Sequence, residues 1–349
     1  MIEAWLNRRW YGTSAPAALR PLSGLYGAAV SARRAAFRRG WLRAHRVGVP
    51  VVVVGNLTVG GTGKTPLTIW LALRLAQQGL AVGLVSRGYR RDSAQVRVLG
   101  PDAGWREVGD EPLLLHRRTR CPTAVARDRV AAATALIERG AQVILADDGL
   151  QHLRLARDFE IVVIDGSRGF GNGRLLPAGP LRESLARLRT VDAIVLNGAP
   201  EHESLRGGAA LPGSPFSMRL DPGPAERLIS GETRAIESFR GRVHAVAAIG
   251  HPERFFRELA ARGLDPIPHP FPDHHPLGAA ELDFGDDLPV LMTEKDAVKC
   301  AGFADPRLWC VPVEARFSEA DAQRLTELVL RKIDSSPYCG SWLHGCPST

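Results

Sequence analysis

The residues best suited to chemistry lie in a glycine-rich segment that follows a short apolar run at residues 51–54. Its members are Gly60, Gly61, Thr62, Gly63, Lys64 and Thr65. Backbone N–H groups of such a turn, together with the start of the helix predicted over residues 64–78, form a cradle for phosphate oxygens. In a P-loop of this kind the lysine contacts the β- and γ-phosphates of ATP, and the threonine hydroxyl binds Mg²⁺. Thr58 stands where the first glycine of the motif is usual, so the pattern departs at one position.

Two neighbouring acids, Asp147 and Asp148, end a second apolar run at residues 143–146. Carboxylates at the end of a strand beside a P-loop organise Mg²⁺ and its waters. We therefore expect both acids to lie near Thr65. Gln151 and His152 follow directly and are candidate contacts to the substrate.

A third acid, Asp110, is the first candidate for a general base that activates a hydroxyl acceptor. It lies in a Gly-Asp-Glu-Pro sequence, where it could instead cap a helix that begins near Glu111. A further polar group contains His269, Asp273, His274 and His275. This group could bind a metal ion or form an ordinary polar loop, and the residues alone leave both interpretations open.

The positive charge is concentrated at the N-terminus. Residues 1–48 contain nine arginines and a single acidic residue, so this arm accounts for the whole formal net charge of +8. It also carries Trp5, Trp10 and Trp41, and residues 31–46 are predicted to form a helix. An arginine-rich arm with aromatic residues is suited to an anionic membrane or to nucleic acid. Its longest weakly apolar run, residues 21–32, is shorter than the about 20 residues that a spanning helix needs.

Lysine is rare in this sequence. Only Lys64, Lys295, Lys299 and Lys332 are lysines among 45 basic residues. Arginine is planar and forked and cannot always replace a compact ammonium group. The five cysteines are scattered without a C-x-x-C pair, and we expect them to be reduced thiols.

Short apolar runs alternate with helical patterns between residues 49 and 200, which predicts a mostly parallel sheet covered by helices on both faces. The predicted fold class is therefore α/β, of the P-loop NTPase type. The chain divides into an arm at 1–48, a P-loop core at 49–200, a Gly/Pro/Ser-rich boundary at 201–225, a smaller α/β domain at 226–333 and a disordered tail at 334–349.

Three kinds of P-loop protein fit these features. One is a small-molecule or lipid kinase, and the alternative is a membrane-recruited switch or partition-type ATPase. The signature lysine of the latter falls on Val59, which argues against it. A GTPase needs N-K-x-D for guanine, whereas residues 293–296 have the wrong order. Beyond the arm there is no basic excess that would suit nucleic acid.

Eight segments in order resemble the motif set of the tetraacyldisaccharide 4′-kinases. These segments are residues 60–66, 86–89, 108–112, 147–152, 176–183, 249–256, 271–274 and 293–299. The resemblance covers roughly residues 1–315. Each motif except the P-loop is weak alone, but their order is specific.

The resemblance implies transfer of the γ-phosphate of ATP to the 4′-hydroxyl of a tetraacylated glucosamine disaccharide 1-phosphate, in lipid A biosynthesis. It also implies a monotopic enzyme on the cytoplasmic face of the bacterial inner membrane. The arm would then meet anionic lipid, not nucleic acid. The resemblance further implies that Asp110 is paired with a histidine, which the motif places at His274.

Other polar residues of these motifs have less specific expectations. Arg182 and Glu183 follow a Pro-Ala-Gly-Pro turn and are expected to line the substrate cleft. Arg87 and Arg127 are candidate phosphate contacts. Lys295 and Lys299 are as well suited to a structural role as to a catalytic one.

Overall fold

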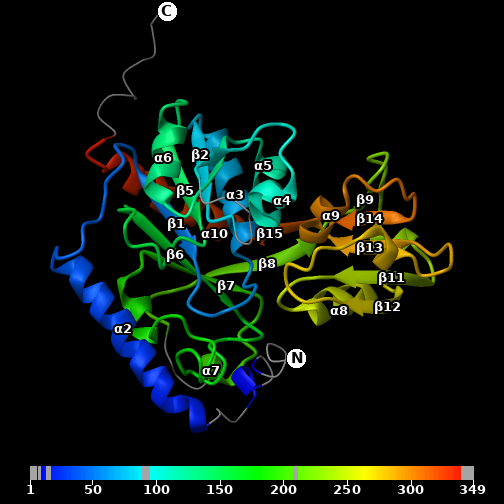
Figure 1. The fold of residues 1–349 in the computed structure, drawn as a ribbon, viewed down its shortest axis with the longest axis horizontal. Coiled ribbons are helices and arrows are strands. Elements are labelled where there is room, and N and C mark those ends of the chain that lie inside the picture. The colour runs from blue at the N-terminus through cyan, green and yellow to red at the C-terminus, as the bar shows by residue number, and fades with distance from the viewer. Residues whose placement is uncertain (1–5, 7–8, 13–16, 89–94, 207–210, 339–349) are drawn as a thin grey trace, which may run out of the picture.

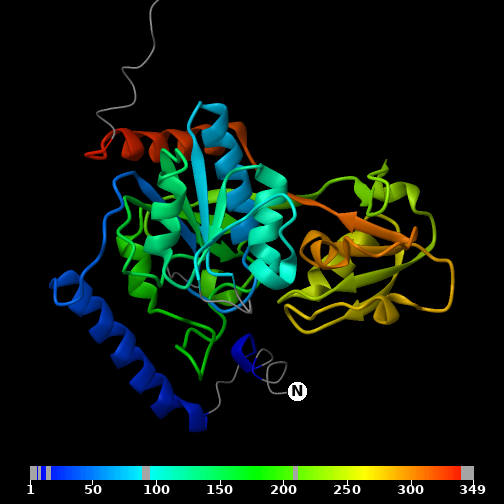
Figure 2. The ribbon, with the colours of Figure 1, turned by 45° about the horizontal axis from the view of Figure 1, so that its top comes forward.

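The computed structural model describes residues 6, 9–12, 17–88, 95–206 and 211–338. They form a larger unit that carries both ends of the described chain and a smaller unit beside it (Figures 1 and 2). The helical elements of the larger unit are η1 (Ala17–Leu19), α2 (Arg20–Arg38), α3 (Lys64–Gln77), α4 (Trp105–Val108), α5 (Asp110–Thr119), α6 (Arg129–Ile137), η2 (Leu185–Thr190), α7 (Glu203–Arg206) and α10 (Glu319–Asp334). Its strands are β1 (Val51–Gly55), β2 (Val82–Ser86), β3 (Arg97–Val98), β4 (Thr123–Val125), β5 (Val143–Asp147), β6 (Phe159–Asp165), β7 (Ala193–Asn197), β8 (Phe216–Pro222) and β15 (Val313–Phe317).

The nine strands of the larger unit pair in the order β15-β8-β7-β6-β1-β5-β2-β4-β3. All neighbours are parallel except the two edge strands, β15 and β3, which are antiparallel to their partners. The central strand β1 is Val-Val-Val-Val-Gly and is buried along its whole length. A continuous β-branched run of this kind suits a strand that is covered on both faces. The predicted mostly parallel sheet is confirmed.

Helices cover both faces of this sheet, as predicted. Val52 and Val54 of β1 pack in the same apolar cluster as residues of α3, α5 and α10. Val51 and Val53 point to the opposite face, where they share a cluster with residues of α6. The two faces therefore hold separate cores, and β1 contributes to both.

The smaller unit is a second α/β sheet. Its elements are β9 (Ala225–Arg227), β10 (Thr233–Arg234), η3 (Ile236–Ser238), β11 (Arg242–Ala247), α8 (Pro252–Ala261), β12 (Asp265–Pro270), η4 (Ala279–Leu282), β13 (Val290–Thr293), α9 (Glu294–Cys300) and β14 (Leu308–Val311). The six strands pair in the order β10-β9-β14-β13-β11-β12. Apolar residues of α8 pack on one face of this sheet, and those of α9 pack on the other.

The expected domain boundaries need correction. Residues 201–225 contain β8, which pairs with β7 in the main sheet, so this stretch is not simply a linker. Residues 313–333, expected in the smaller domain, form β15 and most of α10 and return to the larger unit. The pairing of β15 with β8 was not predicted, because β8 lies inside a Gly/Pro/Ser-rich stretch, where only Phe216 and Met218 alternate with exposed residues. The smaller unit is therefore an insertion between β8 and β15.

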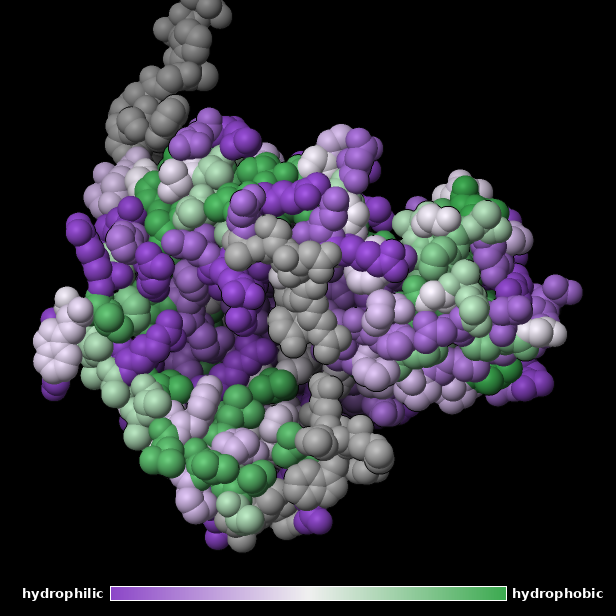
Figure 3. All heavy atoms as spheres, in the orientation of Figure 1, coloured by the Kyte–Doolittle hydropathy of each residue, from purple (hydrophilic) through white to green (hydrophobic). Residues whose placement is uncertain are grey.

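The N-terminal helix also differs from the expectation. It spans Arg20–Arg38, with Pro21 in its first turn, and not residues 31–46. Gly40, with a φ of 75°, follows its end. The surface of α2 is mostly exposed, including Leu22 and Leu25. Figure 3 shows hydrophobic surface that follows this helix along one side of the molecule. Among the described helices none is both long enough and apolar enough to cross a bilayer. The predicted disordered tail begins too early, because Asp334 ends α10 and Ser336 is buried. The rest of this prediction, from position 339 onward, lies outside the described residues.

Candidate functional site

The candidate site forms where the carboxyl ends of the strands of both sheets face each other. The P-loop follows β1, the acidic pair follows β5, and His274 follows β12 of the smaller unit. In open α/β sheets, ligands bind beyond the carboxyl ends of the strands. The two units are in close contact here, because a Cβ atom on Gly250 would lie 3.1 Å from the backbone nitrogen of Gly61. Residues far apart in the sequence are thus brought to one edge.

The P-loop has the backbone that a phosphate cradle needs. Gly63 lies in the left-handed region, with a φ of 95°, and a Cβ there would lie 2.7 Å from Nδ2 of Asn197. Only glycine satisfies both conditions without strain. Lys64 begins α3 directly after it, so the N–H groups at the start of this helix face the loop.

Two buried polar atoms beside the loop have no hydrogen-bond partner among the described residues. They are Oγ1 of Thr62 and Oδ1 of Asn56. A buried polar group without a partner is costly and usually indicates a ligand or water that completes it. Other atoms of these two residues hold the loop together, since the Asn56 amide donates to the carbonyl of Gly60 at 3.3 Å. The loop therefore has a defined backbone conformation, and the side-chain oxygens of Thr62 and Asn56 are available to a ligand or water.

Asp147 lies under the first turn of α3, as predicted. Its carboxylate accepts hydrogen bonds from the hydroxyls of Thr65 at 3.3 Å and Thr68 at 3.0 Å. Burial, with the negative charge of Glu111 nearby, raises the pKa of Asp147 to about 7, against the opposing effect of Lys64. A carboxylate held in this way lacks a sufficient positive partner. The addition of a divalent cation next to Thr65 would supply one.

Asp148 has a different environment, although it is the adjacent residue. Both its carboxylate oxygens accept from one nitrogen of Arg182, at 3.0 and 3.1 Å, and Nζ of Lys64 lies 3.7 Å away. Burial opposes ionisation of Asp148, but these cations outweigh it and hold the pKa well below the usual range. Its backbone is left-handed, with a φ of 48°, which turns the chain sharply after β5. Lys64 and Arg182 are thus already gathered around one carboxylate.

Asp110 and His274 are in direct contact, as the family resemblance implied. Nδ1 of His274 lies 3.0 and 2.9 Å from the two carboxylate oxygens of Asp110. His274 has a φ of 62°, an uncommon value for a residue with a side chain. Burial by itself would raise the pKa of Asp110, but the hydrogen bond from His274 and the charges of Lys295 and Lys299 lower it far below normal. Asp110 is therefore a firmly ionised carboxylate.

Asp110 does lie at the start of a helix, as the capping alternative supposes, but it is not the N-cap residue. The residue at the N-cap of α5 is Gly109, and Asp110 is the first helical residue. Its Oδ1 atom does accept from the backbone N–H of Glu111, at 2.9 Å. Asp110 can accept from the backbone of Glu111 and contact His274 at the same time, so its position in the helix leaves room for a second role.

The histidine-rich group does not converge on a metal ion. His269 contacts His244, His275 contacts Glu281, and His274 contacts Asp110. Within the described part of the chain, no group of three or more His, Cys, Asp or Glu side chains is arranged to bind a metal. Since each of these histidines has a separate partner, the metal interpretation of this group is wrong for the described residues.

The remaining predicted substrate residues fall into two sets. Glu183 is buried, and its carboxylate contacts Arg34 at 2.8 Å, Gln151 at 3.1 Å and Arg187 at 3.7 Å. Glu183 thus joins α2 to the site, and both Glu183 and Arg182 line the cavity of about 250 Å³ beside this helix, which fits the expectation that they line a cleft. Gln151 also donates to the carbonyl of Asn56, at 3.1 Å.

His152 and the two candidate arginines lie differently. Burial and the charge of Arg129 lower the pKa of His152 to about 4, so it is neutral near pH 7. Its Nε2 atom is buried and has no partner among the described residues. Arg87 and Arg127 are exposed, at the ends of β2 and β4. Their predicted contact with phosphates remains a prediction.

Several residues at this edge were not singled out from the sequence. Arg168 follows β6, and one of its guanidinium nitrogens would lie 3.0 Å from a Cβ on Gly60. The same side chain stacks on the ring of Tyr11 at 3.7 Å and donates to the carbonyl of Gly250 at 3.3 Å. Asn197, at the end of β7, donates to the carbonyl of Thr62 at 3.0 Å. The sequence does contain a pattern that could have identified Arg168 and Asn197, since each is a polar residue at or just after the end of a buried strand, as Asp147 is.

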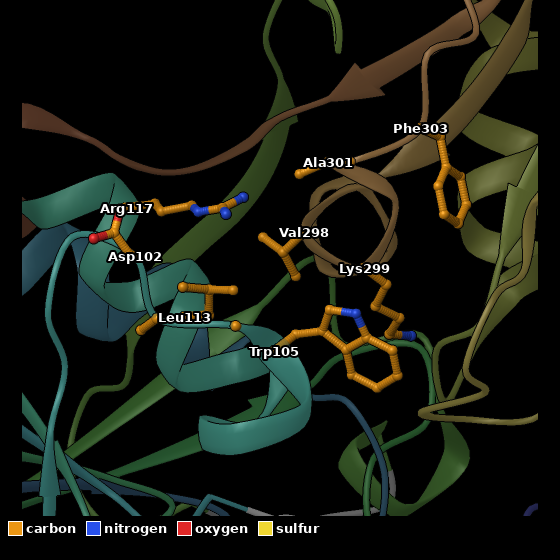
Figure 4. Close-up of a pocket in the computed structure, with 11 residues that line it drawn as sticks. Asp102, Trp105, Leu113, Arg117, Val298, Lys299, Ala301 and Phe303 are labelled. Atoms are coloured by element: carbon orange, nitrogen blue, oxygen red, sulfur yellow. The ribbon is translucent and has the colours of Figure 1, made fainter.

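The contact between the two units is polar at the site and loosely packed beside it. A cavity of about 430 Å³ lies between α4, α5 and α9. Figure 4 shows Arg117 of α5 and Val298 of α9 directed toward one another across this space. Lys299 lines this cavity and lies 3.6 Å from Asp110, so an ion pair connects the two units beside it.

Comparisons with known proteins point to one family. The profile of the family described as tetraacyldisaccharide-1-P 4′-kinase matches residues 15–334. A tetraacyldisaccharide 4′-kinase from Alkalilimnicola ehrlichii is 54% identical over 317 residues, which are 90% of this chain and 92% of that protein. One from Xanthomonas euvesicatoria is 50% identical over 321 residues, 89% of this chain and 92% of the relative.

A solved structure agrees with these sequence comparisons. The crystal structure of LpxK from Aquifex aeolicus in complex with ATP has a TM-score of 0.75 and 28% identity, over 90% of this chain and 98% of the other. The match therefore includes the inserted smaller unit as well as the P-loop sheet. From the sequence, the fold and the site together, the chain belongs to the tetraacyldisaccharide-1-P 4′-kinase family and is a phosphotransferase that acts on a hydroxyl group.

Proposed function

We propose that this kinase binds ATP with Mg²⁺ at the P-loop and transfers the γ-phosphate to the 4′-hydroxyl of a membrane-embedded tetraacyldisaccharide 1-phosphate, next to Asp110. The observation that carries the proposal is the convergence of three groups at one edge. They are the loop at residues 60–65, the acidic pair and the Asp110–His274 contact. The alternative of a switch or partition-type ATPase gives no reason for a buried Asp–His pair supplied by a second unit.

The nucleotide has a natural place in the loop. Backbone N–H groups from Gly60 to Thr65 would hold the phosphates, and Lys64 would leave Asp148 to meet the migrating phosphoryl group. The related LpxK structure was solved with ATP, which supports the same nucleotide here. Arg168, which spans the loop and the smaller unit, is suited to neutralise the same phosphates.

The residues present fit a magnesium ion. The Thr65 hydroxyl and the Asp147 carboxylate lie together, and Asp148 is adjacent. Mg²⁺ uses one or two carboxylates with phosphate oxygens and waters, and not a full cage of protein ligands. When bound, the ion would neutralise charge on the phosphates and relieve the unbalanced burial of Asp147.

Asp110 would accept the hydrogen bond of the attacking hydroxyl. Its pKa is too low for it to be a strong base, so it is suited to orienting the hydroxyl and receiving the proton late. The loose transition state of phosphoryl transfer asks little of the nucleophile before bond formation. His274 would fix the orientation of the carboxylate through the hydrogen bond that it donates.

The acceptor would reach the site from a lipid surface. The helix α2 exposes Leu22 and Leu25, and a cavity of about 250 Å³ lies between this helix and Arg182. Arginines near anionic headgroups contribute on the order of 1 kcal/mol each. We propose that the enzyme is a peripheral protein on the cytoplasmic face of a bacterial inner membrane, which the exposed leucines of α2 and the family relation support.

The test is transfer to a defined acceptor. The purified chain is incubated with ATP, Mg²⁺ and tetraacyldisaccharide 1-phosphate in mixed micelles, and the position of the new phosphate is read by ³¹P NMR and mass spectrometry. We expect a second phosphate at the 4′ position, and none in the presence of EDTA or with Lys64→Ala. Hydrolysis of ATP without phosphorylation of the lipid would instead support the switch ATPase.

A further inference from the structure

Lys295 lies at the centre of the contact between the two units, in the first turn of α9. Its Nζ atom is 3.1 Å from Oε1 of Glu111, 3.0 Å from Oδ1 of Asp273 and 3.2 Å from Nε2 of His274. The side chain is 15% exposed. Three acceptors around one nitrogen match the three donors of a lysine ammonium group.

The group at this position is an ammonium ion. Burial alone would lower the pKa of Lys295, but the carboxylates of Glu111, Asp110 and Asp273 raise it far above normal. An ammonium group can only donate hydrogen bonds. The His274 nitrogen that faces it must therefore be the acceptor, which means that Nε2 carries no proton. The proton of a neutral ring is then on Nδ1, where it faces Asp110 at 2.9 Å.

A competing acceptor lies on the same side of the ring. Oδ1 of Asp273 is 3.8 Å from Nε2 of His274, and Lys295 contacts both atoms. Without the ammonium group, a proton on Nε2 would gain Asp273 as a partner. His274 would then be an imidazolium between the carboxylates of Asp110 and Asp273, with Glu111 left unpaired. Lys299, 3.6 Å from Asp110, is the other cation in contact with this pair.

We propose that Lys295 is a positioning residue that holds His274 as the neutral Nδ1–H tautomer and so keeps Asp110 free to accept the proton of the substrate hydroxyl. This proposal rests on the proposed function of the Asp110–His274 pair. It explains why a lysine stands here in a chain that uses arginine at 41 of its 45 basic positions. A planar guanidinium cannot place three donors around one point.

The first experiment reads the tautomer directly in the full-length protein. Histidine labelled with ¹⁵N gives separate shifts for protonated and unprotonated ring nitrogens, and His274→Gln identifies the signals. At pH 7 we expect a protonated Nδ1 and an unprotonated Nε2 for His274. In Lys295→Met we expect both nitrogens to be protonated. A wild-type spectrum with a proton on Nε2 overturns the proposal, whatever the variants do.

The second experiment follows activity against pH. With ATP, Mg²⁺ and the lipid acceptor, Lys295→Met should lower kcat on the order of 10- to 100-fold at pH 7. The acid limb of the kcat/KM profile should move up by about 1 pH unit or more, because an imidazolium now persists to higher pH. The KM for ATP should stay within about twofold. The matched control is Lys332→Met, which removes a lysine of α10 that lies 3.9 Å from Asp192. It should leave kcat, KM and the pH profile unchanged.

A rescue separates positioning from a merely structural ion pair. Adding Asp273→Asn to Lys295→Met removes the competing carboxylate, so the double variant should recover part of the lost rate and return the acid limb toward the wild-type position. If the double variant is slower than Lys295→Met, or if Lys295→Met keeps the wild-type tautomer and pH profile, the proposal is wrong. A silent Asp110→Asn variant would instead refute the proposed function of the pair, while the NMR result would still stand.

Discussion

The substitution Asp110→Asn tests the central contact of the site with little change of shape. Asparagine keeps an oxygen that can accept from the backbone N–H of Glu111, now 2.9 Å from Oδ1, so the start of α5 should persist. It loses the negative charge that faces His274 at 2.9 Å and Lys299 at 3.6 Å. The variant therefore removes the hydroxyl acceptor while it preserves the local backbone.

The expected loss follows from that geometry. A positioned base contributes on the order of 10² to 10⁴ in rate. Because Asp110 is a weak base, we expect the lower end, a fall in kcat of on the order of 10²-fold, or about 2.7 kcal/mol in activation free energy. His274→Ala should cost a similar amount. The double variant should be little slower than either single one, because the two side chains act as one unit.

The assay is initial-rate phosphorylation of the lipid acceptor under saturating ATP, with nucleotide affinity measured separately by calorimetry. Asp321→Asn is the matched control, since Asp321 also lies in the first turn of a helix and accepts a backbone N–H, from Ser217 at 3.0 Å, but on α10. Losses that simply multiply in the double variant would refute the reasoning. So would a near-normal rate in Asp110→Asn, which would leave only the local helix contact.

Three further outcomes are expected. Lys64→Ala should lower the rate of lipid phosphorylation by on the order of 10³-fold and leave the circular dichroism spectrum unchanged. Lys64→Arg should restore little of this rate, because a forked guanidinium group does not fit a loop that surrounds a compact ammonium group. A wild-type rate in Lys64→Arg would contradict the P-loop role of Lys64. Leu25 and Trp41 are 69% and 72% exposed, so the double variant Leu25→Ser/Trp41→Ser should sediment less with anionic vesicles, whereas Ile229→Ser, 51% exposed on the smaller unit, should not change sedimentation. Equal sedimentation of the double variant, Ile229→Ser and the wild type would exclude the region of Leu25 and Trp41 as the anchor. The pKa of Asp147 is raised to about 7, so the folded protein keeps a proton that the unfolded chain loses near pH 4. The free energy of unfolding should therefore fall as the pH rises from about 4 to about 7. Above pH 7 and without divalent cations, Asp147→Asn should therefore have a higher Tm than the wild type. Added Mg²⁺ should reduce this difference in Tm. If Mg²⁺ leaves the difference in Tm unchanged, Mg²⁺ does not bind at this carboxylate.

The sheet around the P-loop was predictable because its signals are local. Strands such as β1 and β5 are unbroken apolar runs that end in a glycine-rich turn or in acids, and these patterns need no knowledge of neighbours. The predicted meeting of Thr65 and Asp147 follows from the same logic, since both lie at the carboxyl ends of adjacent parallel strands.

The remaining features depend on contacts between distant segments. Asp110 and His274 are 164 residues apart, and only a family resemblance placed them together. The return of β15 to β8 was missed because an antiparallel edge pair has no signature in either strand alone. The ion pair between Glu183 and Arg34 was not predicted, because Arg34 lies on a helix whose bounds were predicted wrongly.

The insertion between β8 and β15 also sets an order for folding during synthesis. When the ribosome has made β8, the main sheet still lacks its edge strand and the helix α10, whose Leu325 and Val329 pack in the same core cluster as Phe216. The smaller unit runs without interruption from β9 to β14 and is therefore complete before the larger one. A nascent chain that stops short of residue 313 would hold a finished smaller unit beside a P-loop sheet with one edge uncovered, and such an edge invites pairing with other chains. Residues 313–334 thus complete the unit whose synthesis began before that of the smaller one.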